Sequence, residues 1–183
     1  MDLLVPDAEH LPGFVDALRR GWSPSTEHDI SGEILEHIDR DVDDFLAQAD
    51  DRDPQGRTVT LPDGSQVPRL PGFARWMWDD GFCGSINARW QPGTADLPPH
   101  VLGHVGYSVV PWKRQRGYAT EALRLLLLEL ADLGLPYVEL TTDPDNVASQ
   151  KVITGNGGVL VGEFEKGPQY GGGAGLLYRI PLG

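Results

Sequence analysis

Three basic side chains gather in one short stretch of an otherwise acidic chain: Lys113, Arg114 and Arg116. The stretch lies between an apolar run, Val105 to Val110, and a segment with helical periodicity, Thr120 to Leu133. The start of a helix presents N–H groups without intrahelical partners and the positive end of the helix dipole. A basic loop that opens into a helix is therefore suited to bind phosphate groups.

Small residues in the same loop keep its backbone accessible. Gly117 has no side chain and Ala119 has a short one, so a bulky pyrophosphate can approach the main-chain N–H groups. The alternative is an ordinary strand, loop and helix with basic residues on the surface. No Ser-His-Asp order, paired cysteines or His-x-x-x-His pattern points instead to a hydrolase or to a metal site.

The loop resembles the acyl-CoA-binding signature of the GNAT superfamily of acetyltransferases. It reads Arg114-Gln115-Arg116-Gly117-Tyr118-Ala119, against Arg/Gln-x-x-Gly-x-Gly/Ala in the family. Three flanking stretches match the family's order as well: His104 to Val109, Thr120 to Leu123, and Asn146 to Ser149. The resemblance covers residues 70 to 165 well and the first seventy poorly. It implies a mixed α/β fold, with a mostly antiparallel, twisted sheet that is flanked by helices and splits around the cofactor.

The resemblance also implies an activity, transfer of an acetyl group from acetyl-CoA to a primary amine of a small molecule or peptide, by direct attack in a ternary complex. By this resemblance, an N–H group near Val109 is expected to bind the thioester carbonyl. Asn146 is expected to contact the cofactor, and the alternative is that it caps the helix that follows it. No metal is expected. The residues expected to bind acetyl-CoA are Val109, Lys113, Arg114, Gln115, Arg116, Gly117, Tyr118, Ala119, Thr120, Asn146 and Ser149.

His104 and Tyr107 are the candidate catalytic residues. His104 stands where related sequences often have Glu, and an imidazole titrates near neutrality, as a general base for an amine requires. The alternative is a structural histidine on a strand. The chain has Ile153 where many members have the Tyr that protonates the leaving thiolate, so Tyr107 is expected to serve, with Tyr178 or water as alternatives.

This departure leaves other functions open. The chain could be a CoA-binding sensor without turnover, or it could transfer a longer acyl group or use a hydroxyl acceptor. Its formal net charge of −12 disfavours nucleic acid and favours a cationic acceptor such as an amine. Much of this charge lies in the segment Glu27 to Asp53, which also reads as a solvated face.

Length and composition describe one soluble domain. Its 183 residues suffice for one core, and the start of the chain has neither a membrane-spanning run nor a signal peptide, so a cytoplasmic location is expected. The single cysteine, Cys83, agrees with a reducing compartment. The sequence leaves the oligomeric state open, a homodimer included.

The pattern divides the domain into three parts: a variable acceptor side at 1–70, a cofactor-binding core at 71–165, and a Gly-rich loop with the last strand at 166–183. Within the first part, residues 50–71 read as a surface excursion with at most one short hairpin and a turn signal at Pro62-Asp63-Gly64. The expected strands are 1–5, 73–78, 82–90, 105–110, 137–142, 159–164 and 176–181, and the expected helices are 11–18, 34–46, 120–133 and 147–154.

Overall fold

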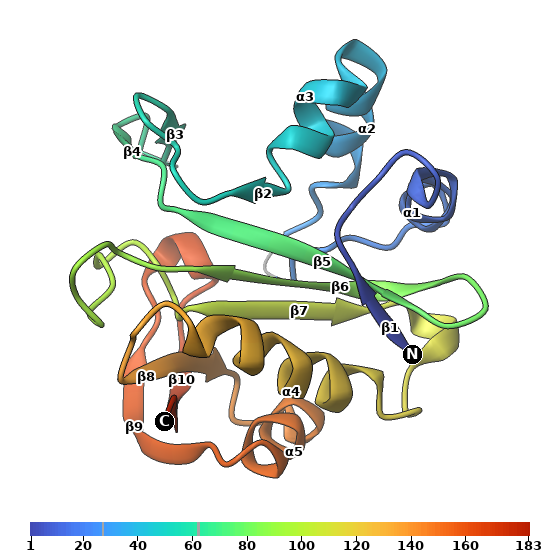
Figure 1. Ribbon diagram of the computed structural model, residues 1–183. Helices are drawn as coiled ribbons and strands as arrows, with labels where there is room; N and C mark the ends of the chain where they lie inside the picture. The colour runs from blue at the N-terminus through green and yellow to red at the C-terminus, as the bar shows by residue number, and fades with distance from the viewer. Residues whose placement is uncertain (27, 62) are drawn as a thin grey trace.

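Two antiparallel sheets lie one above the other in the core (Figure 1). The computed structural model describes residues 1–26, 28–61 and 63–183, so Glu27 and the Pro62 of the expected turn lie outside the described residues. The first sheet has the order β1–β5–β6–β7, with β2 on the far part of β5: β1 Asp2–Leu4, β2 Asp50–Asp51, β5 Gly72–Trp78, β6 Phe82–Arg89 and β7 Val105–Val109. The second has the order β8–β10–β9: β8 Tyr137–Thr142, β9 Val159–Glu165 and β10 Ala174–Pro181.

The β5–β6 hairpin forms where alternation and the Asp80-Gly81 pair predict it. Both turn residues have positive φ, 47° at Asp80 and 102° at Gly81, as a primed turn requires. Trp76 and Trp90 are buried in the core, and Trp78 is half-buried against it. The tryptophans of this region therefore pack against the sheet, and none of them lines the cavity between the two sheets that is described below.

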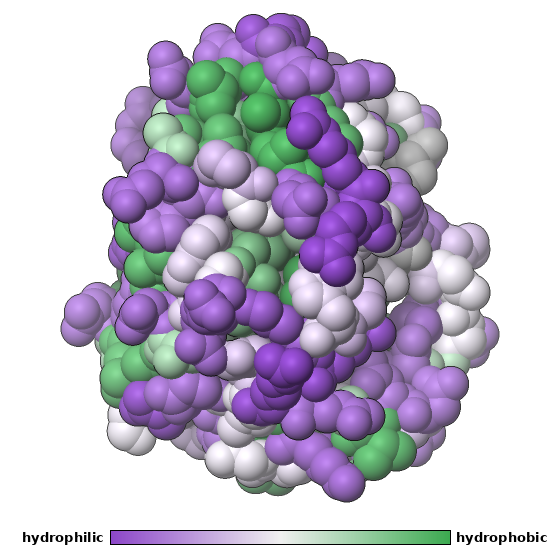
Figure 2. Space-filling view, turned by 90° about the vertical axis from the view of Figure 1, so that its right-hand side faces the viewer, coloured by the Kyte–Doolittle hydropathy of each residue, from purple (hydrophilic) through white to green (hydrophobic). Residues whose placement is uncertain are grey.

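Three helices cover the upper face of the first sheet: α1 Leu11–Arg19, α2 Ser31–Arg40 and α3 Val42–Ala47 (Figure 1). The single helix expected at 34–46 was wrong, because the chain breaks at Asp41, where φ is −159° and ψ is 89°. The Asp41 carboxylate accepts a hydrogen bond from the N–H of Asp44 and so caps α3. Figure 2 shows an apolar group near the height of these helices, surrounded by hydrophilic side chains.

Two helices lie on the other side, next to the second sheet: α4 Tyr118–Ala131 and α5 Val147–Gly155 (Figure 1). α4 begins two residues earlier than expected, because Gly117 adopts the left-handed conformation, with φ of 81°, directly before it. Its buried stripe, Ala122, Leu123, Leu126 and Leu130, packs into the larger core cluster together with Ile86 of β6 and Leu140 of β8. α4 therefore joins the two sheets.

The rest of the chain forms short elements. A hairpin of β3 Thr58–Thr60 and β4 Gln66–Pro68 stands near the start of β5 (Figure 1), in agreement with the expectation of at most one short hairpin in this segment. Two 3-10 turns, η1 Pro111–Lys113 and η2 Pro168–Tyr170, follow β7 and β9. Among the described residues there is no helix whose length and apolar character would let it cross a membrane.

Candidate functional site

The two sheets meet at one end and separate at the other, between β7 and β8. At the closed end His104 donates its N–H to the Glu139 carbonyl at 2.7 Å, and Glu139 donates its N–H to Nδ1 of the His104 ring at 3.0 Å. Gly103 lies so close to β8 that an added Cβ would be 3.0 Å from the Glu139 oxygen. Beyond this junction no strand ladder joins β7 to β8 in the part of the chain that the structure describes.

His104 is a buried residue of this junction, with 1% of its surface exposed. Since Nδ1 accepts a hydrogen bond, the ring proton is on Nε2, which is buried near the Ala95 backbone without a hydrogen bond of normal geometry. Burial lowers the pKa of the imidazole, although the Glu139 carboxylate partly opposes this. The ring does not line the cavity. This position favours the structural alternative for His104 over direct proton transfer.

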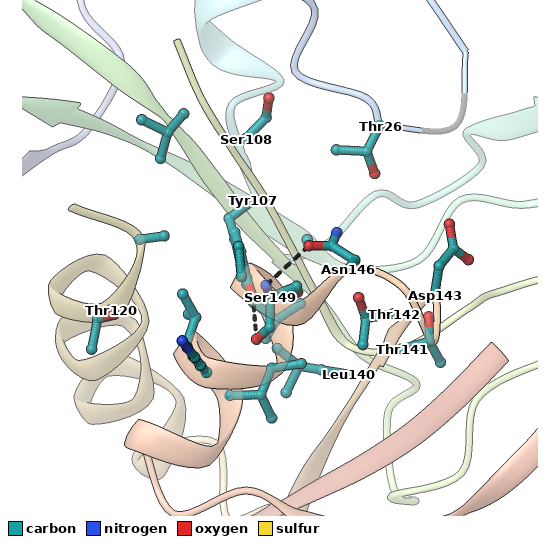
Figure 3. A pocket seen from close by; sticks show the side chains of 18 of the residues that line it. Thr26, Tyr107, Ser108, Thr120, Leu140, Thr141, Thr142, Asp143, Asn146 and Ser149 are labelled. Carbon is teal, nitrogen blue, oxygen red and sulfur yellow. Dashed lines mark hydrogen bonds between the residues drawn. The ribbon is translucent and has the colours of Figure 1, made fainter. Parts of the chain in front are cut away.

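A cavity of about 760 Å³ occupies the open end of the split. It runs between the basic loop and α4 on one side and β8 with the start of α5 on the other (Figure 3). All residues expected to bind the cofactor line it, except Arg116. Arg116 lies outside, near the Tyr118 hydroxyl and the Asp79 carboxylate. The local sequence motif therefore maps onto one continuous hollow.

Val109 turns its N–H toward this hollow. The next residue, Val110, donates its N–H to the Cys83 carbonyl on the β6 side. Because successive N–H groups of a strand point to opposite edges, the Val109 N–H points to the edge that faces the split. A carbonyl oxygen placed in the cavity could accept a hydrogen bond there.

The basic loop presents its backbone to the same hollow. Gln115 and Gly117 both have positive φ, 62° and 81°, and the loop runs directly into the N-terminus of α4. Such a backbone makes a concave array of N–H groups that suits an anion. No heavy atom lies within 4 Å of a Cβ built at Gly117, so the loop backbone is accessible there, although the φ of 81° would strain any other residue.

Lys113 is held in place from across the fold. Its ammonium donates to three carbonyl oxygens of the β5–β6 turn, at 2.7 Å to Asp79, 3.1 Å to Asp80 and 3.3 Å to Gly81. Tyr118, at the start of α4, donates its hydroxyl proton to the Asp79 carboxylate at 2.7 Å, which lowers the pKa of Asp79. The β5–β6 turn thus anchors both ends of the basic loop.

Tyr107 reaches across the split from β7 to α5. Its hydroxyl lies 2.7 Å from Oγ of Ser149, and both residues line the cavity (Figure 3). Asn146 caps α5 by accepting the Ser149 N–H at 3.0 Å, and it lines the cavity too. Burial raises the pKa of Tyr107 to about 12, so its hydroxyl keeps its proton at neutral pH. Tyr178 is buried in the core and does not line the cavity.

Several lining residues come from parts of the sequence without a recognisable motif. Thr26 closes the cavity from above, and Ser108 points toward the same side (Figure 3). Ser108 accepts a hydrogen bond from the Trp22 indole at 2.9 Å and donates one to the Ser23 carbonyl at 3.0 Å. These bonds hold the segment before Thr26 over β7, and no local pattern in the first seventy residues predicted this contact.

The far wall adds polar and charged groups. Asp143 and Lys166 line the cavity and form an ion pair. Tyr170, also in the lining, donates its hydroxyl proton to the His100 carbonyl. The described residues contain no group of three or more His, Cys, Asp or Glu side chains that could hold a metal ion. The site therefore combines a loop backbone suited to an anion, a strand N–H that faces the cavity, and a tyrosine that keeps its proton at neutral pH.

Comparisons with known proteins agree with this geometry. The family profile described as "Acetyltransferase (GNAT) domain" matches residues 23–159. A search of curated protein sequences found no match.

Solved structures share the fold over nearly the whole chain. The microcin C7 self-immunity acetyltransferase MccE, solved with acetyl-CoA and AMP, has a TM-score of 0.64 at 13% identity, with 98% of this chain and 91% of that chain covered. A Salmonella typhimurium acetyltransferase that modifies the N-terminal serine of ribosomal protein L7/L12 has a TM-score of 0.65 at 15% identity, with 99% and 94% covered. The ribosomal L7/L12 α-N-protein acetyltransferase RimL, solved with coenzyme A, has a TM-score of 0.62 at 14% identity, with 98% and 93% covered.

The family match spans most of the chain and includes the split, the basic loop and the Tyr107–Ser149 pair. This chain belongs to the GNAT family of acetyltransferases and is an acetyl-CoA-dependent acyltransferase.

Proposed function

We propose that this protein is an N-acetyltransferase that acetylates a primary amine of a small molecule or peptide by direct attack in a ternary complex. The observation that carries the proposal is that one continuous cavity in the split contains all the groups that the reaction needs. It joins an anion-binding loop, the open N–H of Val109 and the Tyr107 hydroxyl. Acetyl-CoA is an anionic, elongated molecule with a thioester carbonyl, and these three features match its phosphates, its carbonyl and its leaving sulfur in turn.

Each group then has a distinct task. The backbone from Gln115 to Thr120 binds the pyrophosphate, and the Val109 N–H stabilises negative charge on the carbonyl oxygen. Tyr107, protonated at neutral pH, donates a proton to the departing thiolate, while Ser149 orients the tyrosine hydroxyl. A thiol with a pKa of about 8.5 needs only modest help to leave.

The acceptor amine enters the site neutral in this proposal. The His104 ring is buried outside the cavity, and the Glu139 carboxylate pairs with Arg179 at 2.6 Å. Neither group therefore competes well as a base for the ammonium. The acid side of the pH profile then reports the pKa of the acceptor itself, so acceptors with lower pKa values should show profiles shifted to lower pH.

A peptide N-terminus is one acceptor of this class that deserves a direct test. Two of the structures that share the fold are described as acting on the α-amine of a ribosomal protein, although at about 15% identity this likeness concerns the fold. The alternatives remain a CoA-binding sensor without turnover, an enzyme for a longer acyl group, and one for a hydroxyl acceptor.

Release of free CoA separates these functions. Acetyl-CoA and longer acyl-CoA esters would each be offered with panels of small amines, peptides and alcohols, and thiol release would be followed over many turnovers. Amine-dependent release from acetyl-CoA supports the proposal. Calorimetric binding of acetyl-CoA without release for any acceptor would support the sensor instead, and faster release from longer esters or with alcohols would favour the other two.

A further inference from the structure

A second hollow lies outside the cavity in the split. This hollow, called the hairpin groove below, has a volume of about 360 Å³. It lies between the β3–β4 hairpin on one side and the start of β5 with the end of β6 on the other. Its lining includes Val59, Leu61, Arg69, Ala74, Asn87 and His100. Nothing described so far gives this groove a task.

The hairpin groove adjoins the cavity at several points. Asn87 of the groove pairs in register with Gly106 of the cavity, and the Asn87 amide would lie about 3.5 Å from a Cβ added at Gly106. Val101 of the groove is followed directly by Leu102 of the cavity. The two hollows thus adjoin across Asn87, and a peptide that extends from the cavity over this residue would reach the groove.

Strand spacing sets how far an acceptor must reach. Ala74, Asn87 and Gly106 are successive partners on β5, β6 and β7, so the part of the groove over Ala74 lies two strand spacings from Gly106. Two spacings are about 10 Å, and an extended chain advances about 3.3 Å per residue. The Val109 N–H, where the thioester carbonyl would bind, lies three residues further along β7, so the attacking amine is about 14 Å from this part of the groove. An extended peptide would therefore place about its fifth residue in the groove.

The charge of the groove differs from that of the whole protein. Its lining contains the side chains of Arg69, Arg89 and His100 and no Asp or Glu among the described residues, whereas the formal net charge is −12. Arg69 donates to the Gln48 side chain at 2.7 Å and lies 3.7 Å from the Asp51 carboxylate behind it. Arg89 donates to Asn87 at 3.4 Å. Arg69 also donates to the Gln48 carbonyl at 3.2 Å, and because an arginine has five N–H donors, these contacts orient the Arg69 guanidinium and leave it capacity for an anion.

Apolar side chains accompany the basic ones. Val59 and Leu61 come from the hairpin, Leu70 from the segment between β4 and β5, and Phe73 from the start of β5. Charges more than about 8 Å away are largely screened at physiological salt, so the acids on remote parts of the surface act only weakly on a group held in the groove. The lining suits an extended segment that has an anionic side chain beside apolar atoms.

We propose that the hairpin groove binds the segment that follows the acceptor amine of a peptide substrate, and that the peptide has an acidic side chain near its fifth residue. The inference rests on the proposed N-acetyltransferase function and narrows its acceptor class to peptides of this kind. Arg69 is a specificity-determining residue in this arrangement, because its guanidinium is available to the acidic side chain and takes no part in the acetyl transfer.

The test uses Gly/Ala decapeptides with a free N-terminus that have Glu, Gln or Lys at each of positions 2 to 6. For the wild-type protein we expect kcat/KM at position 5 to be at least tenfold higher with Glu than with Lys. Arg69→Gln should reduce this ratio at least fivefold while keeping activity toward the Gln peptides. Arg57→Gln is the matched control, since Arg57 is the exposed cross-strand neighbour whose carbonyl accepts the Arg69 N–H but which does not line the groove.

The outcomes are distinguishable. Equal use of Glu and Lys peptides, an equal loss of preference in Arg57→Gln, or turnover with small amines but no peptide would each overturn the groove proposal while the N-acetyltransferase function stands. Release of no CoA with any acceptor would contradict that function. In that case, binding of fluorescent versions of the same peptides in the presence of CoA still decides the groove: a Glu preference that depends on Arg69 supports it, and no preference overturns it.

Discussion

The hydroxyls of Tyr107 and Ser149 lie 2.7 Å apart across the split, and they join β7 of the first sheet to α5 beyond the second. Tyr107 comes from the strand that offers the Val109 N–H, and Ser149 from the helix that Asn146 caps. Because the pair links the two walls of the cavity, it fixes the distance between β7 and α5 at that depth. In the proposed reaction Tyr107 is also the proton donor.

Replacement of Tyr107 by Phe should lower kcat by about a hundredfold, since general acid catalysis contributes typically 10²–10⁴. Affinity for acetyl-CoA should change little, because the phosphates are bound elsewhere. Steady-state rates and calorimetry would measure the two effects. Tyr178→Phe is the control, as Tyr178 is a buried tyrosine outside the cavity lining.

With a pKa of about 12 for Tyr107, no basic limb from this group should appear below pH 10 in the pH profile of turnover. Wild-type turnover in Tyr107→Phe would assign the proton to water.

Substitution of Gly117 by Glu should weaken acetyl-CoA binding more than tenfold, about 1.4 kcal/mol. The variant places a carboxylate beside the phosphates and strains a backbone with φ of 81°. Gly134→Glu controls for the strain and the added charge, because Gly134 also has positive φ, 70°, and open space, at the opposite end of α4. Similar affinities of the two folded variants in calorimetric titration would contradict the location of the phosphate site.

Removal of the Asp79 carboxylate should weaken acetyl-CoA binding, although simple electrostatics predicts the opposite for an acid near phosphates. The reason is that the Asp79 carboxylate holds the Tyr118 hydroxyl at the start of α4, whereas the bond from Lys113 to the Asp79 carbonyl survives the substitution. We expect Asp79→Ala to raise the Kd severalfold, and Tyr118→Phe to add little to it, because both remove the same bond. Asp80→Asn removes an acid from the same turn and leaves the Tyr118 bond intact. Tighter binding by Asp79→Ala would show that charge outweighs positioning.

His104→Asn should keep most of the turnover and its acid limb, because the ring lies outside the cavity. The variant keeps an acceptor for the Glu139 N–H, whereas His104→Ala leaves that buried group unpaired and should cost about 1–3 kcal/mol of stability. Denaturant unfolding would measure the cost. A hundredfold loss of turnover in a stable His104→Asn would instead restore His104 as the general base.

The same residue predicts a pH dependence of stability. Its folded pKa is below the ordinary 6.5, so the unfolded chain binds the proton more readily. Stability should therefore fall as the pH drops below about 6.5, until the pH reaches the lower folded pKa. Other titratable groups also change the free energy of unfolding with pH. The measurement is therefore the difference in this free energy between wild-type and His104→Asn at each pH, because the variant should lose the part of the pH dependence that comes from His104.

The cofactor loop could be predicted from sequence because its signals are local. The order of strand, basic loop, glycine and helix is written in consecutive residues from Val105 to Leu133, and the β5–β6 hairpin follows from alternation and the Asp80-Gly81 pair. The position of Asn146 as the cap of α5 was predictable for the same reason, because the helix follows it directly in the sequence. These features depend on the backbone preferences of neighbouring residues and on short spacings between them, and both can be read from the sequence.

The tertiary structure decided the tasks of individual side chains, because these depend on partners far away in sequence. The ammonium of Lys113 binds a turn more than thirty residues earlier, and His104 pairs with Glu139, thirty-five residues later. The position of Arg69 and Arg89 along one groove depends on how the β3–β4 hairpin folds over β5. Composition indicated only a net charge of −12. The local basic character of that groove arises because folding brings together residues that are separated in the sequence by acidic ones.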